Sequence, residues 1–323
     1  MNKILNRILK GSGTPDLINF LANNLSPTDL QSLLLEVYNR RIKKLYPADV
    51  FHQYIENRFV KPSLIKGEIY TAFDEMAFRL LPNGFETIEL SPLAPLGSCS
   101  AIAPVNQNNI VTTIRNTEVC SDNTNVMAME CVQRRRQKPK KIVKLCSSFR
   151  VLRAQMFSEP AAFAHFRVFS LCTSGRDTGN FRFEIESVSE HIQYYLNLIE
   201  YSKKKRFQVG RICVVISAFD TGNLSIIEQE IINPLIEKNS QIHFKIDQNR
   251  TEARGYYLSV AFRIYVSDKA GEQFLIVDGG LTDWTQLWLS SNKERLLISG
   301  FGSERFILCF GYKNSSKSGK QQE

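Results

Sequence analysis

The chain has 323 residues, of which 43% are hydrophobic and 11% aromatic, so it holds enough apolar material for one large folded domain with an appendage. This composition excludes a chain that is disordered throughout. The 41 Lys and Arg residues outnumber the 32 Asp and Glu residues, and the resulting net charge of +9 makes polyanions such as ATP or RNA favourable partners.

The cysteines and the first residues bear on the compartment. The seven cysteines show no CxxC spacing, and we expect them to be reduced, mostly buried thiols. The opening residues MNKILNRILKGSG lack the apolar segment and cleavage site of a signal peptide, and no run of about 18 apolar residues could span a membrane. We therefore expect a cytoplasmic protein without a membrane partner.

Residues 1–62 are predicted to form a helical appendage of three or four short helices. Leu17, Ile18 and Leu21 recur at helical spacing, and the residues from Ser26 to Asp29 are typical of a helix start. This segment resembles no family that we can name.

Residues 63–312 are predicted to form the core, which begins with a long helix at Ser63. One apolar stripe runs along this helix, formed by Ile65, Ile69, Phe73, Met76 and Leu80. Pro82-Asn83-Gly84 ends it. The polar tail, residues 313–323, is predicted to be disordered.

Strand-like runs dominate the rest of the core. They cover residues 87–90, 142–146, 165–173, 181–186, 211–217, 256–266 and 274–278, with helical patterns at about 123–135, 187–201, 225–238 and 303–311. A loop as short as 177–180 cannot make a parallel return, so neighbouring strands are predicted to be antiparallel. The fold class is therefore α+β, an antiparallel β-sheet flanked by helices, with an N-terminal helical appendage.

Residues 84–93, GFETIELSPL, follow the long helix directly and contain Pro92 near their end. They resemble motif 1 of class II aminoacyl-tRNA synthetases, in which a helix leads through a turn into a strand that ends in a proline. In that family motif 1 builds the dimer interface, so the resemblance implies a homodimer. A helix-turn-strand joint without this role is the other interpretation.

Residues 165–186, HFRVFSLCTSGRDTGNFRFEIE, are predicted to form a strand, a short loop and a strand. They resemble motif 2, in which an arginine at the end of the first strand holds the α-phosphate of ATP and the substrate carboxylate. A guanidinium suits this role because it can meet two phosphoryl oxygens at once. Arg176 ends the strand and is assigned this role, with Arg167 as the alternative and Phe183 as a further ATP contact. The family usually has Glu two residues on, where this chain has Thr178. A surface hairpin with exposed arginines is the competing interpretation.

Residues 297–306, LISGFGSERF, resemble motif 3, in which a strand runs through a glycine turn into a helix whose arginine contacts the γ-phosphate of a bent ATP. Gly300 and Gly302 would let the backbone approach the nucleotide, and Arg305 would point at it from the first helical turn. The order and spacing of the three segments carry the resemblance more than any one of them.

Two further matches point towards histidyl-tRNA synthetase. The segment from Arg254 to Tyr257 resembles its R-G-L-D-Y-Y signature with two residues missing, and residues 277–284, VDGGLTDW, resemble its G-G-R-Y-D segment. Asp122 lies where that family has an acidic residue that contacts the substrate amino group. The implied substrate-binding residues are Asp122, Arg254, Tyr256, Tyr257, Gly279 and Gly280. The departures from both signatures argue against histidine as the substrate.

Asp278 and Asp283 flank the Gly-Gly turn, and carboxylates of this kind could hold Mg²⁺ beside the triphosphate. Aspartates that form a turn explain them nearly as well. The basic runs 134–141 and 203–206 could contact RNA phosphates, although cations at predicted helix C-termini are the more ordinary explanation.

We therefore predict an ATP-dependent, adenylate-forming ligase that activates an amino acid or other carboxylate. Arg176 and Arg305 are its predicted catalytic residues, and ATP and Mg²⁺ its cofactors. The alternative is a non-catalytic synthetase paralogue that acts as a regulatory or scaffold subunit, like the ATP phosphoribosyltransferase regulatory subunit. A compact RNA-binding module rests on charge alone. The anticodon-binding domain that follows motif 3 in histidyl-tRNA synthetases is expected to be missing.

Overall fold

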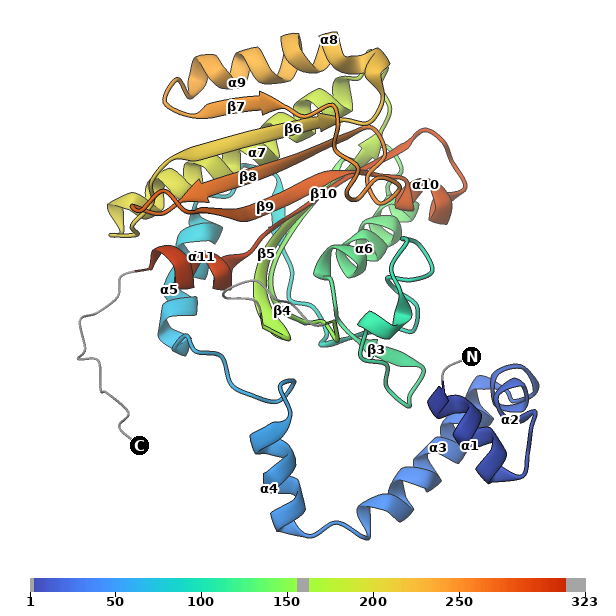
Figure 1. Cartoon of the computed structure of the whole chain (residues 1–323). Coiled ribbons are helices and arrows are strands. Elements are labelled where there is room, and N and C mark those ends of the chain that lie inside the picture. Colours follow the sequence, from blue (N-terminus) through green and yellow to red (C-terminus); the bar gives the residue numbers. More distant parts are fainter. Residues whose placement is uncertain (1–2, 156–162, 312–323) are drawn as a thin grey trace, which may run out of the picture.

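The computed structural model describes residues 3–155 and 163–311. Its centre is an eight-stranded sheet in the order β1-β4-β5-β10-β9-β8-β6-β7 (Figure 1). The strands are β1 (Phe85–Thr87), β4 (Val143–Leu152), β5 (His165–Arg176), β6 (Ile212–Ala218), β7 (His243–Ile246), β8 (Val260–Ser267), β9 (Gln273–Thr282) and β10 (Glu294–Phe301). All neighbouring pairs are antiparallel except the two edge pairs, β1 with β4 and β6 with β7. The predicted α+β class with a largely antiparallel sheet is confirmed.

Helices cover both faces of this sheet. The helix α7 (Arg182–Lys204) packs against β5, β9 and β10, whereas α6 (Asn123–Gln137) packs against β4, β5 and β10. Side chains of β10 alternate between the two faces: Leu297 and Phe301 join the apolar cluster on the α7 side, and Leu296 and Ile298 join the cluster on the α6 side. The sheet is therefore the middle of three layers.

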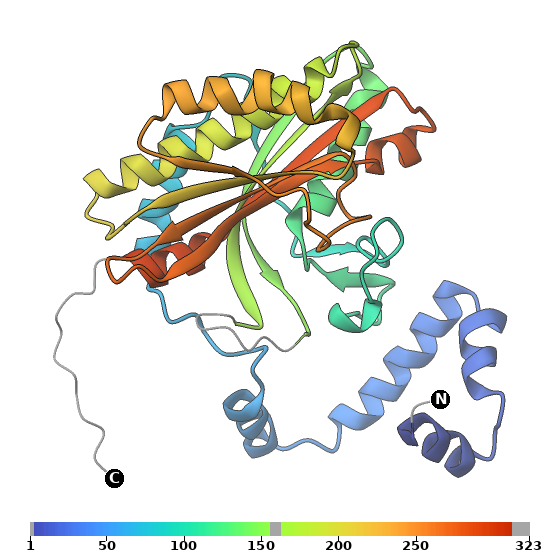
Figure 2. The same ribbon diagram turned by 45° about the horizontal axis from the view of Figure 1, so that its top comes forward.

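The other helices extend these layers. On the α7 side lie α5 (Gly67–Arg79), α11 (Ser303–Phe310) and the stretch formed by α8 (Leu224–Ile226), η4 (Ile227–Ile232) and α9 (Asn233–Lys238), which runs beside α7 (Figure 2). On the α6 side lie α10 (Trp284–Leu289) and a small sheet of β2 (Leu93–Pro95) and β3 (Thr117–Val119). Two short 3₁₀ turns, η2 (Gln107–Asn109) and η3 (Thr221–Asn223), complete the core.

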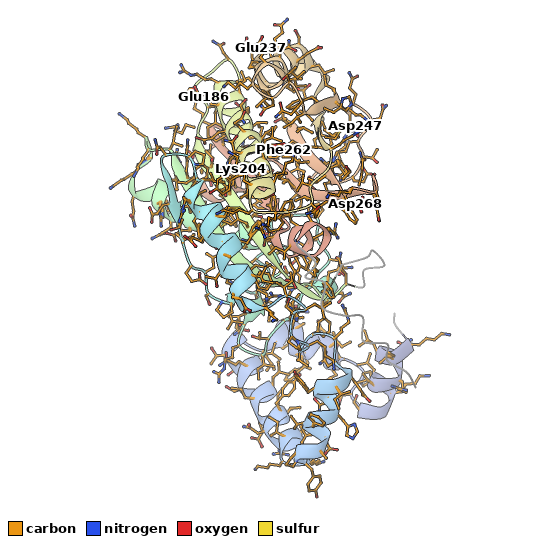
Figure 3. The ribbon with its side chains drawn as sticks, turned by 90° about the vertical axis from the view of Figure 1, so that its left-hand side faces the viewer. Glu186, Lys204, Glu237, Asp247, Phe262 and Asp268 are labelled. Carbon is orange, nitrogen blue, oxygen red and sulfur yellow. The ribbon has the colours of Figure 1, made fainter. Side chains whose placement is uncertain are left out.

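The N-terminal residues form helices, as predicted, and lie apart from the sheet (Figures 1 and 3). They are α1 (Lys3–Ser12), α2 (Leu17–Asn19), η1 (Phe20–Asn24), α3 (Pro27–Ile42) and α4 (Pro47–Glu56), and none of them has a buried side chain. In the ranges 3–155 and 163–311, no helix is both long enough and apolar enough to cross a membrane.

One predicted strand is wrong. Residues 182–186 form the start of the 23-residue helix α7, and Phe181 precedes it as the N-cap in a left-handed conformation with φ 57°. Phe181, Phe183 and Ile185 alternate as a strand would, but Arg182 pairs with Glu186 at 2.7 Å across one helical turn. Alternation over so few residues does not distinguish the two structures. The predicted disorder of residues 313–323 lies outside the described residues.

Candidate functional site

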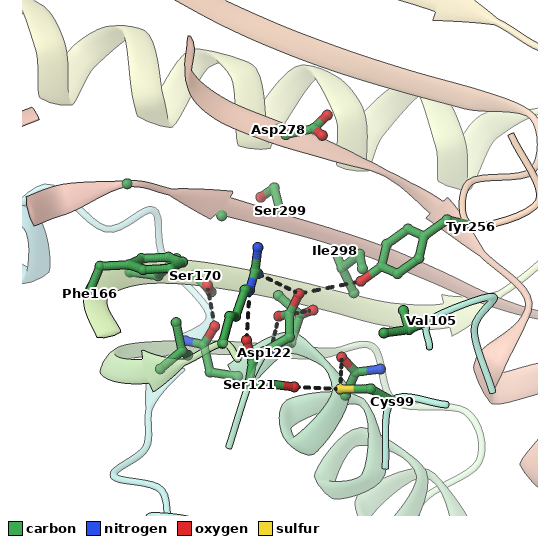
Figure 4. A pocket seen from close by; sticks show the side chains of 18 of the residues that line it. Cys99, Val105, Ser121, Asp122, Phe166, Ser170, Tyr256, Asp278, Ile298 and Ser299 are labelled. Carbon is green, nitrogen blue, oxygen red and sulfur yellow. Dashed lines mark hydrogen bonds and ion pairs between the residues drawn. The ribbon is translucent and has the colours of Figure 1, made fainter. Parts of the chain in front are cut away.

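A cavity of about 470 Å³ lies on the α6 side of the sheet. Its walls come from separate parts of the chain: the residues before α6, the first turn of α6, the β4–β5 hairpin, residues 253–257 and the ends of β9 and β10. Figure 4 shows Phe166, Asp122 and Tyr256 reaching into this space from three of these segments. The sheet thus gathers residues that are far apart in sequence.

Asp122 is fixed at the centre of this cavity because it caps the N-terminus of α6. Its Oδ1 accepts hydrogen bonds from the backbone N–H of Thr124 at 3.0 Å and from the Thr124 hydroxyl at 2.7 Å. Its Oδ2 has longer contacts, to the Tyr256 hydroxyl at 3.4 Å and to Arg153 Nη2 at 3.5 Å. This second oxygen can still accept a shorter bond from a ligand ammonium group.

Arg153 follows the last residue of β4 and lies beside Asp122. Its Nε donates to the Ser121 carbonyl at 3.0 Å, and its guanidinium carbon is 5.2 Å from the centre of the Phe166 ring on β5. Gln155, two residues on, also lines the cavity. The antiparallel strand pair with an arginine just beyond its first strand is therefore β4 with β5, and the segment 165–186 is a strand followed by the start of a helix.

Arg176 lies at the other end of β5, opposite Glu294 in the register, and its Nε is 3.7 Å from Glu294 Oε1. Phe169 is opposite Phe301, next to the glycine turn that leads to Arg305. The seven residue-to-residue steps from Phe169 to Arg176 correspond to roughly 23 Å of extended strand. The structure therefore does not bring Arg176 and Arg305 together.

Phe183 also lies away from the cavity. It is buried in α7, where its ring packs so closely on Gly175 that a Cβ on that glycine would lie 2.8 Å from it. Phe183 is thus a core residue on the α7 face. The aromatic side chain of β5 that lines the cavity is Phe166.

The predicted motif 3 residues do line the cavity. Gly300, Gly302 and Arg305 all contribute to its wall, and Gly302 is the N-cap of α11. Arg305 Nη1 donates to the Leu275 carbonyl at 3.4 Å. The neighbouring Glu304 is 2% exposed and lies 2.9 Å from Arg150, which ties the start of α11 to β4.

The segment from Arg254 to Tyr257 is only partly in the site. Tyr256 and Tyr257 line the cavity, and burial raises the pKa of both hydroxyls well above the usual value. Arg254 is not a lining residue; its guanidinium lies over the Phe219 ring at 5.8 Å.

Gly279 and Gly280 do not line the cavity either, and packing explains their small size. A Cβ on Gly280 would lie 2.6 Å from the Tyr257 ring, and one on Gly279 would lie 2.5 Å from the Ser299 Cβ. Both glycines therefore make room for neighbours in the sheet, and Gly280 supports the cavity indirectly because Tyr257 packs on it.

The two aspartates predicted to hold Mg²⁺ are not brought together. Asp278 lines the cavity but is paired with Arg250 Nη2 at 3.1 Å and lies 3.8 Å from Arg263 Nε. Burial raises the Asp278 pKa, while the two arginines oppose that shift. Asp283 caps α10 and does not line the cavity. In the part of the chain that the structure describes, no group of three or more His, Cys, Asp or Glu side chains could hold a metal ion.

Sequence comparison identifies no relative: no family model and no curated protein matches the chain. The architecture, however, is a class II aminoacyl-tRNA synthetase-like fold, a largely antiparallel sheet flanked by helices.

Three solved structures show this likeness. Apo histidyl-tRNA synthetase from S. aureus superposes with a TM-score of 0.53 at 14% identity, over 75% of this chain and 64% of that chain. An ATP phosphoribosyltransferase regulatory subunit/histidyl-tRNA synthetase from Bacillus halodurans superposes with a TM-score of 0.55 at 12% identity, over 78% of this chain and 83% of that chain. The RNA binding domain of threonyl-tRNA synthetase from Cryptosporidium parvum Iowa II superposes with a TM-score of 0.53 at 11% identity, over 75% of this chain and 62% of that chain. The match thus spans less than two thirds of the S. aureus enzyme.

Proposed function

We propose that this chain binds ATP together with an amino acid or other small carboxylate and joins them as an acyl adenylate. In this reaction a carboxylate oxygen attacks the α-phosphorus, a new P–O bond forms, and pyrophosphate leaves. The observation that carries the proposal is that Arg153 and Arg305, about 150 residues apart in sequence, line one cavity. Two guanidinium groups are suited to neutralise separate oxygens of one triphosphate.

The other lining residues suit two neighbouring subsites in this cavity, one for the base of ATP and one for the amino group of the substrate. The Arg153 guanidinium lies over the Phe166 ring, and the two together offer a planar surface against which a base can stack. On the other side of Arg153, Asp122 and Tyr256 form a polar pair that suits a ligand ammonium group. Arg153 is then positioned to contact both the α-phosphate and the substrate carboxylate, and to stabilise charge that develops between them.

No step of this proposal runs through Mg²⁺. Asp278 is already paired with Arg250 and near Arg263, so the carboxylate that faces the cavity is not a good ligand for a metal ion. In this account Arg250, which is 3% exposed, neutralises the Asp278 carboxylate behind that wall.

The direct test is amino-acid-dependent exchange of labelled pyrophosphate into ATP, measured over a panel of amino acids. We expect exchange with at least one of them, a loss of about 100-fold in Arg153→Ala and Arg305→Ala, and a change below threefold in Arg176→Ala. If wild-type protein shows no exchange with any amino acid, or if Arg176→Ala loses as much as Arg153→Ala, the proposal is overturned.

A second candidate is a non-catalytic regulatory or scaffold subunit. It is favoured by Gln155, since the synthetase pattern has Glu two residues after the arginine, and by the likeness to the Bacillus halodurans structure. A regulatory subunit would still bind a ligand in this cavity. Ligand binding by calorimetry without pyrophosphate exchange would favour this second candidate.

We also propose that two copies associate through the region of α5 and β1, where the resemblance to motif 1 lies. Ile69 and Phe78 on α5 are 41% and 36% exposed. Light scattering should give the mass of a dimer, and Ile69→Glu should shift it towards the mass of the monomer.

The proposed function does not require RNA as a partner. In the basic run, Arg134 pairs with Glu86 and Arg135 pairs with Glu294.

A further inference from the structure

The first turn of α6 carries two buried carboxamide side chains among the residues that line the cavity. Asn123 and Asn125 are each 1% exposed, and both line the cavity wall. Their oxygens accept hydrogen bonds: Asn123 Oδ1 from the Ser170 hydroxyl at 2.8 Å, and Asn125 Oδ1 from Cys99 Sγ at 3.4 Å. Their Nδ2 groups are buried, and neither has a hydrogen-bond partner among the described residues.

A buried N–H donor without a partner lowers stability, so proteins normally satisfy such donors with protein, water or ligand atoms. Here the two donors share a cavity with the N-terminus of a 15-residue helix, whose dipole also favours acceptor atoms. The arrangement is thus suited to a ligand that presents oxygen acceptors at this wall.

The charge of that ligand is restricted by the groups around Asn125. Cys99 and Ser121 are neutral, and burial raises the pKa of the Cys99 thiol to about 12. The two carboxylates of the cavity already have arginine partners, Asp122 with Arg153 and Asp278 with Arg250. With Asp122 taken by the substrate amino group and Asp278 paired with Arg250, a cationic side chain would find no further carboxylate among the described lining residues. The described lining residues include two cations, Arg153 and Arg305, which the proposed function assigns to the carboxylate and the phosphates, so an anionic side chain would find no further cation there.

We infer that Asn125, assisted by Asn123, selects a substrate whose side chain is small, uncharged and able to accept a hydrogen bond, such as a hydroxyl or a carboxamide. The identification of this substrate as an amino acid rests on the proposed function. In this arrangement Asp122 receives the amino group, Arg153 the carboxylate, and Asn125 Nδ2 the side-chain oxygen.

The test uses the full chain and calorimetric binding of isosteric amino-acid pairs: threonine against valine, and asparagine against leucine. Lysine, aspartate and histidine complete the panel. We expect a member with a neutral oxygen acceptor to bind about 10- to 100-fold more tightly than its apolar isostere. In Asn125→Leu this preference should fall below threefold. Asn125→Asp keeps the shape but replaces the N–H donor, and it should lose the preference too.

Amino-acid binding is measured without nucleotide, so the result does not depend on whether the chain also binds ATP. If Arg305→Ala abolishes ATP binding and the preference among amino acids remains, the inference stands on its own. If valine or leucine binds as well as its isostere, if lysine, aspartate or histidine binds best, or if no member of the panel binds, the inference is overturned. Thermal unfolding of both variants, followed by circular dichroism, confirms that they are folded.

Discussion

His191 gives this fold a pH dependence that can be worked out from its surroundings. The imidazole is 0% exposed in α7, with Nε2 2.9 Å from the Thr173 hydroxyl and Nδ1 2.8 Å from the Ser299 hydroxyl. Burial, with a smaller contribution from Lys144, lowers the His191 pKa from 6.5 to about 3. The folded protein therefore keeps this histidine neutral at pH values where the unfolded chain protonates it.

Acidification should consequently favour unfolding. Between pH 6.5 and about 3 the unfolded state binds one more proton at this position, so the free energy of unfolding falls as the pH falls. At pH 5 the loss is about 2 kcal/mol relative to pH 8.

The measurement is urea unfolding of wild type and His191→Gln at both pH values, because the difference between the two proteins removes the effect of the other titrating groups. This difference should shift by about 2 kcal/mol against wild type on going from pH 8 to pH 5. A difference that stays constant, or that moves in favour of wild type, would refute the reasoning.

Three further predictions follow from the packing. Arg135→Leu removes the two contacts, at 2.8 and 3.0 Å, that Arg135 makes with the buried Glu294 carboxylate, and it should lower the free energy of unfolding in urea by about 3–5 kcal/mol. The control Arg40→Ala, which breaks an exposed ion pair with Glu36, should lower it by less than about 1 kcal/mol. Gly280→Ala puts a Cβ 2.6 Å from the Tyr257 ring and should lower the free energy of unfolding by about 1–3 kcal/mol. In the control Gly67→Ala no atom lies within 4 Å of the new Cβ, so stability should hardly change, and equal effects of the two substitutions would contradict the packing role of Gly280. Deletion of residues 1–56 removes no buried side chain among residues 3–56, so the unfolding midpoint of the core should change by only a few degrees in a circular dichroism melt. A core that no longer folds would contradict the view that the N-terminal helices are an appendage.

Sequence reasoning could predict the parts of this fold that depend on long periodic patterns. The helix at 67–79 and the glycine turn before Arg305 follow from local patterns, and the structure contains both. The antiparallel sheet is also present, but the short 177–180 loop from which it was predicted leads into a helix and not into a strand. The prediction failed where a pattern was short, at residues 181–186. Because that segment was predicted to be a strand, β5 was expected to pair with it, whereas the structure pairs β5 with β4 and β10.

Local sequence patterns predict even less of the candidate site, because most of its residues are brought together by tertiary contacts. A local signal for Arg153 exists, since it follows the strand-like run that starts near residue 142 and precedes Gln155 in the place of the expected acidic residue. Nothing local distinguishes Arg250 from Arg254, because which of them is buried depends on how the loop packs against β9. The unpartnered amides of Asn123 and Asn125 likewise depend on contacts with β5 and with Cys99, which no sequence pattern reveals.

The central claim is that Arg153 and Arg305, and not Arg176, share one nucleotide site. Calorimetric titration of ATP into wild type and the three alanine variants tests it most directly. We predict that Arg153→Ala and Arg305→Ala each weaken ATP binding by about 10-fold or more, and that Arg176→Ala binds as wild type does. A wild-type protein that does not bind ATP, or an Arg176→Ala variant that loses binding while Arg153→Ala retains it, would contradict the account.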